Sequence, residues 1–175
     1  SKKKFSVVRY GNVFGSRGSV IPLFIEQAKK GTVQITDDRM TRFTITIQQG
    51  VNFVIDRLFK MWGGEIFVPK ISSYRIKDVA KAFAPKAKII NIGLRAGEKM
   101  HEEMITSSDS YNTLEFKDYY VILPATQDFI NWSLKNFIKK SDSSLGKFCK
   151  EGFSYNSYNN PNYATIPELK KMGEN

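Results

Sequence analysis

The sequence predicts an α/β fold, and three observations lead to this class. Short runs rich in β-branched and aromatic residues alternate along the chain with segments whose apolar residues recur at helical spacing. Glycine and proline residues stand where one kind of segment gives way to the other. Hydrophobic residues make up 41% of the 175 residues, which is enough for one packed core.

The first elements are a strand, a glycine-rich loop, a helix and two extended segments. Residues 5–10 are rich in β-branched and aromatic residues and end at a glycine, which predicts a buried strand. Apolar residues at helical spacing from Ile21 to Ala28 predict a helix that the following glycine, at position 31, stops. Residues 33–35 form a short strand and residues 39–46 an extended segment. Strand, loop and helix in this order are half of a parallel crossover unit.

The middle of the chain continues the alternation. An amphipathic pattern over residues 48–61 predicts a helix, which a pair of glycines ends. Residues 65–68 form a strand that Pro69 stops, and residues 88–92 form the next one. Between them, residues 76–83 form a helix that stops before Pro85, because the residue before a proline is disfavoured in helical geometry.

The remaining elements are small and more separate. We expect a short charged helix over residues 95–104 and a strand over residues 119–123. Residues 129–138 have the pattern of a helix. The tail of residues 153–163, rich in Asn, Tyr and Ser, is expected to be an ordered or semi-ordered extension, with a final short helix over residues 167–172.

Composition and charge argue against several classes of function. The net charge of +10 would suit nucleic acid, but basic residues are spread along the chain without aromatic residues among them, so no nucleic-acid partner is expected. The single cysteine, Cys149, excludes an internal disulfide and favours a reducing compartment. No apolar run approaches the length of a membrane span, and no signal peptide is present, so we expect no membrane and a cytoplasmic protein.

A dinucleotide-binding fingerprint is not found. Gly11, Gly15 and Gly18 come nearest, but their spacing departs from the fingerprint. We therefore expect the sheet of the fold to begin before residue 1.

Four motifs carry a resemblance to a known family. They are RYGNVFGSRGSV at residues 9–20, TDDRMTRF at 36–43, GEIFVPK at 64–70 and RAGEKMHE at 95–102. In order and spacing they resemble the bacterial inverting UDP-N-acetylglucosamine 4,6-dehydratases of the extended short-chain dehydrogenase family. The resemblance covers most of residues 5–123 and returns in the tail at residues 155–157. It implies the carboxy-terminal part of a Rossmann-like fold with a small α/β substrate-binding lobe.

The same resemblance implies two sets of site residues. The substrate-binding set, for a UDP-sugar, is Asn12, Val20, Thr36, Arg95 and Glu98. The cofactor-binding set, at the nicotinamide end of NADP, is Val13, Phe14, Gly15, Ser16 and Arg17. Ligands of open α/β sheets bind beyond the carboxyl ends of strands, where glycines let backbone amides approach phosphates, so a site at this loop is also physically reasonable. The alternative is a plain turn in which asparagine tolerates left-handed geometry.

Arg95 and Glu98 lie three residues apart and would share one face of the predicted helix. The guanidinium suits a pyrophosphate, and the carboxylate can accept hydrogen bonds from ribose hydroxyls. The alternative is a surface salt bridge that contributes little. Arg39 and Arg42 could also reach phosphate, although one of them is expected to serve packing.

No metal site is expected. His101 is the only histidine and lacks the second one that a helical zinc motif requires, so we expect it to be structural. Cys149 has no histidine nearby in the sequence and is not expected to be a nucleophile.

No catalytic residue is expected in this chain. The family's reaction oxidises carbon 4 of the hexose with NADP, eliminates water between carbons 5 and 6, and returns the hydride to carbon 6 with inversion at carbon 5. In relatives a Tyr-x-x-x-Lys pair and an upstream Asp-Lys pair move the protons. None of the eight tyrosines here has a lysine four residues later. We therefore expect the isolated chain to be inactive and the full-length protein to be a lyase.

The resemblance also implies a division of the chain. Residues 1–31 would complete the cofactor domain, residues 32–123 would form mainly the substrate lobe, and residues 124–175 would be a carboxy-terminal extension. It further implies a homo-oligomer at full length, in the synthesis of pseudaminic-acid-type sugars for surface polysaccharides and flagellin glycosylation. Two alternatives stay open: a nucleotide-sugar epimerase of the same family, and a non-enzymatic module that binds a nucleotide or a partner protein.

Overall fold

The computed structural model describes residues 3–16, 18–124, 137 and 146–173. The chain forms two compact units that interleave along the sequence. The first unit comprises Ser1–Tyr10, Gln48–Lys70 and Glu103–Tyr155. The second unit comprises Gly11–Ile47, Ile71–Glu102 and Asn156–Asn175. The predicted functional division at residues 31 and 123 stays a prediction.

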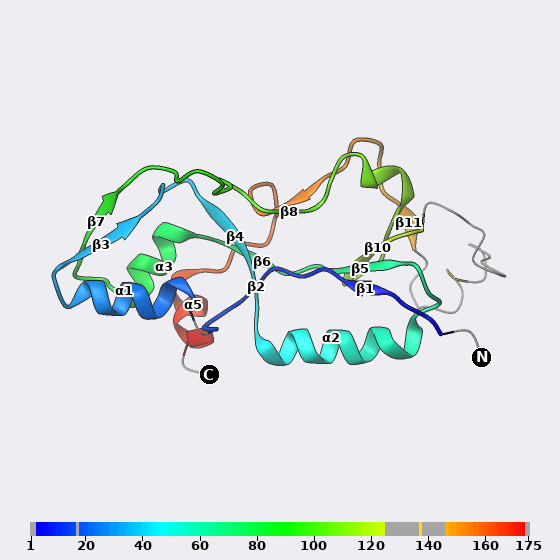
Figure 1. Ribbon diagram of the computed structural model, residues 1–175, viewed down its shortest axis with the longest axis horizontal. Coiled ribbons are helices and arrows are strands. Elements are labelled where there is room, and N and C mark those ends of the chain that lie inside the picture. The colour runs from blue at the N-terminus through cyan, green and yellow to red at the C-terminus, as the bar shows by residue number, and fades with distance from the viewer. Residues whose placement is uncertain (1–2, 17, 125–136, 138–145, 174–175) are drawn as a thin grey trace. The chain divides into compact units, whose positions relative to one another are not determined.

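The first unit is built on a five-stranded sheet (Figure 1). Its strands, in spatial order, are β1 (Val7–Val8), β5 (Ile66–Pro69), β10 (Tyr119–Ile122), β9 (Thr113–Glu115) and β11 (Lys147–Phe148). β1 runs parallel to β5, and the other neighbours are antiparallel. A short 3-10 helix, η1 (Asp109–Asn112), precedes β9. The buried core of this unit contains Phe67, Leu114, Phe116, Tyr119, Val121 and Phe137.

The strand predicted for residues 5–10 is present but short, and the prediction that it is buried is wrong. β1 ends the strand order of its sheet, so only one of its edges pairs in the described residues. Phe5 is 76% exposed and Val7 is 54% exposed. The apolar composition therefore predicted the strand correctly, but it did not predict that the side chains of the strand are exposed.

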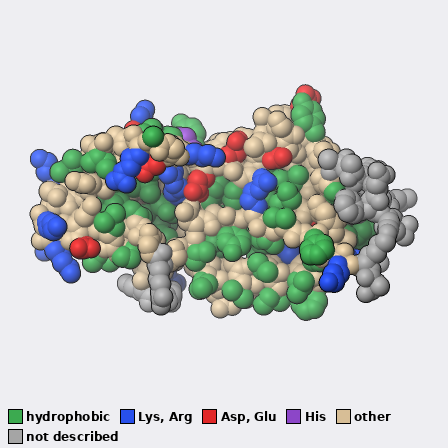
Figure 2. All heavy atoms as spheres, in the orientation of Figure 1, with side chains coloured by type: hydrophobic (Ala, Val, Ile, Leu, Met, Phe, Trp, Pro, Cys, Tyr) green, Lys and Arg blue, Asp and Glu red, His purple; other side chains and the backbone are tan. Residues whose placement is uncertain are grey.

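The helix predicted for residues 48–61 is confirmed as α2 (Ile47–Lys60). Its apolar residues are largely exposed, as the hydrophobic side chains along this helix in Figure 2 illustrate; they are Ile47, Val51, Val54, Ile55, Leu58 and Phe59. Arg57 is instead buried, pairs with Asp56 and stacks its guanidinium over the ring of Tyr119 at 3.9 Å. An arginine can be buried in this way because its planar, weakly hydrated group packs on aromatic faces.

The second unit combines two small sheets with helices. One sheet has the order β2 (Asn12–Val13), β4 (Thr41–Ile45) and β6 (Ser72–Arg75), with β2 parallel and β6 antiparallel to β4. The other pairs β3 (Thr32–Ile35) in parallel with β7 (Lys88–Asn91). The helices are α1 (Val20–Ala28), α3 (Ile76–Phe83) and α5 (Ile166–Gly173). The core between them includes Phe24, Val33, Val79, Ala80 and Leu169, all nearly inaccessible to solvent.

The predicted helix over residues 95–104 is wrong. These residues form turns that lead into β8 (Glu103–Ile105), which pairs with β12 (Tyr155–Asn156). Gly97 has a φ of 84°, in the left-handed region that a helix does not use. The carboxylate of Glu98 accepts the backbone N–H of Arg95 at 3.1 Å, which stabilises a turn in place of a helix.

The other predicted elements of the described residues are present, but the prediction that Pro69 stops its strand is wrong, because β5 includes Pro69 and pairs it with Tyr119. α3 has the predicted bounds, and α5 covers the predicted final helix. The helix expected over residues 129–138 lies outside the described residues except for Phe137. No helix in the part of the chain that the structure describes is long and apolar enough to cross a membrane.

Candidate functional site

The loop between β2 and α1 forms one wall of a cavity of about 290 Å³ in the second unit. β4, β6 and the start of α3 supply the other walls. The lining residues are Asn12, Val13, Phe14, Gly15, Ser16, Gly18, Ser19, Val20, Ile21, Arg42, Tyr74 and Ile76. The cavity lies beyond the carboxyl end of β2, the usual side for a ligand site in an α/β fold, while β4 contributes Arg42 from near its amino end.

This loop spans residues 14–19 and connects the end of β2 to the start of α1. Gly15 and Gly18 have φ values of 73° and 76°, which side chains with a Cβ atom disfavour. No atom lies within 4 Å of the position where a Cβ would stand on either glycine, so their backbone faces open space. Such a loop at the start of a helix brings the backbone close to a ligand, while the N–H groups of Phe14, Ser16 and Ser19 bond to carbonyls within the protein.

Gly11 has a different role, just before β2. A Cβ atom at this position would overlap the Cβ of Phe43 on β4 and come within 3.1 Å of the Phe43 carbonyl. Glycine therefore lets β2 approach β4 closely, and this approach places Asn12 at the cavity wall.

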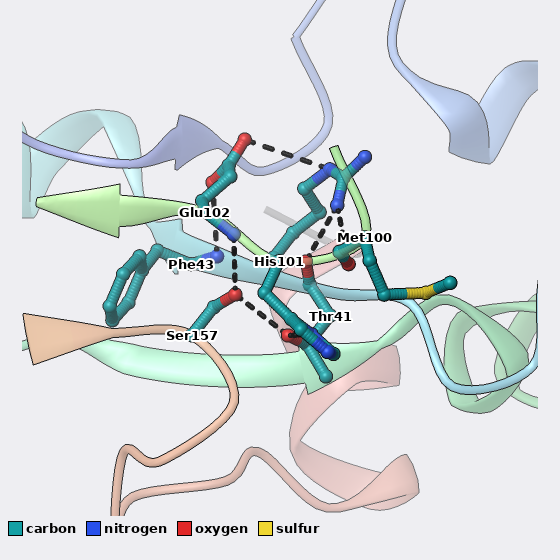
Figure 3. Close-up of polar contacts among 7 residues, drawn as sticks. Thr41, Phe43, Met100, His101, Glu102 and Ser157 are labelled. Atoms are coloured by element: carbon teal, nitrogen blue, oxygen red, sulfur yellow. Dashed lines mark hydrogen bonds and ion pairs between the residues drawn. The ribbon is translucent and has the colours of Figure 1, made fainter. Parts of the chain in front are cut away.

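A polar cluster surrounds Glu102 and includes Thr41, His101 and Ser157 (Figure 3), and Arg42 and Asn12, which line the cavity, contact it. The Arg42 guanidinium donates to the carbonyls of Thr41 and Met100, and its Nε lies 3.6 Å from Oε1 of Glu102. Glu102 also accepts the backbone N–H of Phe43 at 3.3 Å. Arg42 is thus held at the cavity by fixed partners.

His101 belongs to the same cluster. Its Nδ1 lies 2.8 Å from the hydroxyl of Thr41, which in turn lies 2.7 Å from the hydroxyl of Ser157. Burial, together with the nearby guanidinium groups of Arg42 and Arg39, lowers the pKa of His101. A neutral imidazole that bonds to the Thr41 hydroxyl fits the predicted structural role. Within the described residues, no group of three or more His, Cys, Asp or Glu side chains could hold a metal ion.

Tyr74 stands on the cavity wall and packs edge-on against Phe14, with ring centroids 6.0 Å apart. Burial raises the pKa of Tyr74 to about 12, and the carboxylate of Glu102 acts in the same direction. The phenol therefore stays protonated at neutral pH. It can donate a hydrogen bond to a ligand but is a poor general base.

Most of the predicted cofactor set lines the cavity: Val13, Phe14, Gly15 and Ser16 are at its wall, and Arg17 lies outside the described residues. Of the predicted substrate set, Asn12 and Val20 line it as well. The assignment of these residues to cofactor and substrate stays a prediction.

Thr36, Arg95 and Glu98 are not among the lining residues and lie at the carboxyl ends of β3 and β7. The carbonyl of Thr36 accepts the N–H of Gly93 at 3.0 Å, which fastens the chain after β7 to the end of β3. Arg95 and Glu98 follow in an exposed turn, so Thr36 and this turn are at the same end of the two strands. The surface salt bridge considered as an alternative is not formed in the described residues, because Glu98 bonds to the Arg95 backbone.

Sequence reasoning did not single out Tyr74, Glu102 or Ser157, and it left Arg42 outside the main set. Glu102 lies within a motif that carried the resemblance, but its side-chain contacts depend on β4, which is distant in the sequence. Tyr74 comes from a short strand that the apolar pattern did not indicate. No signal in a single sequence would have paired these residues.

The cavity thus combines a glycine-rich loop at the amino end of a helix, an asparagine, an arginine and aromatic side chains on a parallel β-α arrangement. These features are typical of a ligand site in an α/β protein. A family model described as "Polysaccharide biosynthesis protein" matches residues 1–124. The chain belongs to this polysaccharide biosynthesis family.

Individual relatives agree with this assignment. The chain is 48% identical over 174 residues to the UDP-N-acetylglucosamine 4,6-dehydratase (inverting) of Campylobacter jejuni, covering 95% of this chain and 50% of that protein. It is 45% identical over 121 residues to the UDP-glucose 4-epimerase of Rickettsia canadensis, covering 66% of this chain and 36% of that protein. The chain therefore spans about half the length of the dehydratase and matches its carboxy-terminal portion. The resemblance inferred from the four motifs is confirmed.

Among solved structures, the X-ray structure of Pen from Bacillus thuringiensis matches with a TM-score of 0.76 and 32% sequence identity. The match covers 97% of this chain and 49% of that one. Together with the mixed sheets and parallel strand pairs, it confirms the predicted class, part of a Rossmann-like α/β fold of the extended short-chain dehydrogenase type.

Proposed function

We propose that this chain is the part of a nucleotide-sugar dehydratase that binds UDP-N-acetylglucosamine beside the nicotinamide end of NADP. The observation that carries the proposal is the cavity at the end of β2, whose wall is formed by the GNVFGS motif together with Arg42. The 48% identity to an inverting UDP-N-acetylglucosamine 4,6-dehydratase supports this choice of substrate.

Within this proposal the substrate contacts fall in two places. Asn12 and Val20 meet the sugar nucleotide at the cavity, where Arg42 adds a positive charge. Thr36, Arg95 and Glu98 hold the UDP moiety at the ends of β3 and β7. The exposed guanidinium of Arg95 can bind the pyrophosphate in a bidentate way, and Glu98 can accept from the ribose.

The loop after β2 fits the nicotinamide end of NADP. Ser19 is one of the residues that line the cavity. Its hydroxyl is buried and has no hydrogen-bond partner among the described residues. A bound ligand with polar groups would satisfy it. The backbone from Val13 to Ser16 would orient the ring, and Phe14 with Tyr74 would exclude water. When bound, NADP supplies a hydride acceptor for the oxidation at carbon 4.

This chain's own residues would bind and orient rather than move the protons of the reaction. Tyr74 is the tyrosine at the cavity, and its pKa is raised to about 12 by burial. Tyrosine bases work with a pKa lowered by a neighbouring positive charge, which is the opposite direction. We therefore assign the acid-base groups to other parts of the full-length protein.

The second candidate is a nucleotide-sugar epimerase. The 45% identity to UDP-glucose 4-epimerase over 121 residues favours it. The substrate-binding residues would serve either outcome, because both reactions hold the same kind of ligand. The two differ in whether water is lost.

The test is to produce the complete natural polypeptide that contains this sequence and to incubate it with UDP-N-acetylglucosamine and NADP. We expect a product lighter than the substrate by one water in mass spectrometry. A product of unchanged mass but different stereochemistry by NMR would favour the epimerase. Binding of the UDP-sugar without any product would favour a non-enzymatic module, and failure to bind it would contradict the proposal.

We extend the proposal to the setting of the reaction. A dehydratase with inversion at carbon 5 would supply the 4-keto sugar for pseudaminic-acid-type sugars, including those used in flagellin glycosylation. We further propose that the full-length protein is cytoplasmic and a homo-oligomer. Size-exclusion chromatography with light scattering would measure the oligomeric state, and cell fractionation would locate the protein.

A further inference from the structure

Asn12 and Glu102 meet behind the cavity wall in the second unit. With the amide nitrogen of Asn12 directed at Glu102, that nitrogen lies 2.9 Å and 3.0 Å from the two carboxylate oxygens. Asn12 also lines the cavity, whereas Glu102 does not appear among the lining residues. The carboxylate therefore reaches the site only through its neighbours.

A carboxylate has a specific effect on an asparagine amide. The amide presents two N–H donors on one side and a carbonyl acceptor on the other, and the group can rotate to exchange them. An ionised carboxylate only accepts, so it selects the orientation in which the nitrogen faces it. The donor and acceptor pattern that Asn12 offers to a ligand is thereby fixed.

Glu102 is itself held in place from several directions. Its carboxylate accepts the backbone N–H of Phe43 and lies 3.6 Å from Nε of Arg42. Its own backbone N–H donates to the hydroxyl of Ser157 at 2.9 Å (Figure 3). Glu102 thus joins β2 and β4 through its carboxylate and the carboxy-terminal segment through its backbone, and the carboxylate contacts Asn12 and Arg42 of the cavity wall.

We propose that Glu102 is a positioning residue, which orients the amide of Asn12 and the guanidinium of Arg42 and so sets the affinity of the cavity for the nucleotide sugar. This inference rests on the proposed function of the site. Burial raises the pKa of Glu102, against the effect of the Phe43 N–H and of Arg42, so desolvation of this carboxyl is part of the cost of the arrangement. A half-buried carboxylate that contacts two lining residues without lining the cavity itself is expected to organise those residues.

The test is a double-mutant cycle in the complete natural polypeptide, with UDP-N-acetylglucosamine as the probe in calorimetry. We expect Glu102→Ala to weaken binding about tenfold. In an Asn12→Ala background the same change should weaken binding less than threefold, because much of the effect of Glu102 passes through Asn12. The matched control is Glu103→Ala, which removes the neighbouring, exposed carboxylate and should leave affinity unchanged.

Glu102→Gln keeps an acceptor for Asn12 and removes the charge that faces Arg42, so it should retain more affinity than Glu102→Ala. It replaces the alanine variant in the cycle if the latter does not fold. Equal losses in the two backgrounds would overturn the inference, because a purely structural role acts independently of Asn12.

A measurement without ligand separates this inference from the proposed function. NMR of the Asn12 side-chain amide protons should show slower exchange with water in the unaltered protein than in the Glu102→Gln and Glu102→Ala variants. If the unaltered protein does not bind the UDP-sugar, the proposed function fails, whereas the exchange rates still decide whether Glu102 orients Asn12. Identical exchange in all three proteins would overturn the positioning role.

Discussion

Replacement of Arg95 by alanine separates ligand binding from folding at this site. Arg95 is exposed in the turn after β7, and the hydrogen bonds of that turn use its backbone: its N–H donates to the Glu98 carboxylate and its carbonyl accepts the Glu98 N–H, each at 3.1 Å. An alanine keeps both bonds. We therefore expect the melting temperature to change by no more than about 1 °C, as for other exposed substitutions away from structural features.

The effect on ligand binding should be large by comparison. A hydrogen bond to a charged group contributes about 1.5 to 3 kcal/mol, which corresponds to roughly 10- to 100-fold in affinity. We expect UDP to bind more weakly by this factor in Arg95→Ala. The affinity for NADP should be unchanged, because the proposed cofactor contacts lie in the loop after β2 and not at the ends of β3 and β7.

Isothermal calorimetry with UDP and with NADP on the complete natural polypeptide measures both affinities. Lys86→Ala is the matched control, since it also removes one exposed positive charge from the second unit. Unchanged UDP affinity in Arg95→Ala would refute the assignment of the turn to the UDP moiety. An equal loss for NADP, or for UDP in the lysine variant, would mean that net charge and not position explains the effect.

Four further predictions concern other parts of the chain. Gly11→Ala should destabilise the protein by roughly 1 to 3 kcal/mol in urea unfolding, because the added methyl would overlap Phe43; a smaller effect would mean that β2 can move away from β4. Burial raises the pKa of the Cys149 thiol to about 11, so iodoacetamide should react with it about tenfold more slowly than with free cysteine at pH 8, the scarcity of thiolate outweighing its greater nucleophilicity. The isolated 175-residue chain should form no 4-keto sugar, and detection of that product by mass spectrometry would contradict the assignment of the proton-transfer groups to other parts of the protein. The double change Ile55→Lys and Phe59→Lys should reduce aggregation in light scattering without lowering the melting temperature, because both side chains are exposed on α2; a drop in stability would show that these side chains pack in solution.

Local signals in the sequence predicted the helices well. α3 begins and ends at the predicted residues because its apolar spacing is regular and a proline follows closely. The segment of residues 95–104 has the composition of a helix, but Gly97 and the capping carboxylate of Glu98 favour a turn. The charged residues of this segment favour a helix, but the glycine between them opposes one, and its effect prevails here.

Non-local pairing determined what the sequence did not predict. β6 (Ser72–Arg75) has two serines and no apolar alternation, and it is a strand because it pairs with β4 on one side. The candidate site shows the same limit. The motif of residues 12–16 indicated the loop, while Arg42, Tyr74 and Glu102 come to it from other strands and loops. Such contacts depend on topology, which spacing along one chain does not reveal.

The carboxy-terminal segment illustrates why composition alone misleads about order. Its many Asn, Tyr and Ser residues would suit an unstructured tail, since they bury little apolar surface. Here several polar groups have specific partners: the Asn160 amide donates to the carbonyl of Ile71 at 2.8 Å and to the hydroxyl of Ser73 at 2.9 Å, and the backbone of Ser73 bonds to residues on either side of Tyr163.

Hydrogen bonds of this kind contribute little individually, but leaving the buried groups of β6 unpaired would be costly. The segment therefore completes the edge of β6 in place of a further strand. Ser157 lies at the start of this segment and bonds both to the Thr41 hydroxyl and to the Glu102 backbone. The packing that orders the tail consequently also fixes the carboxylate behind Asn12, so the tail belongs to the architecture of the candidate site.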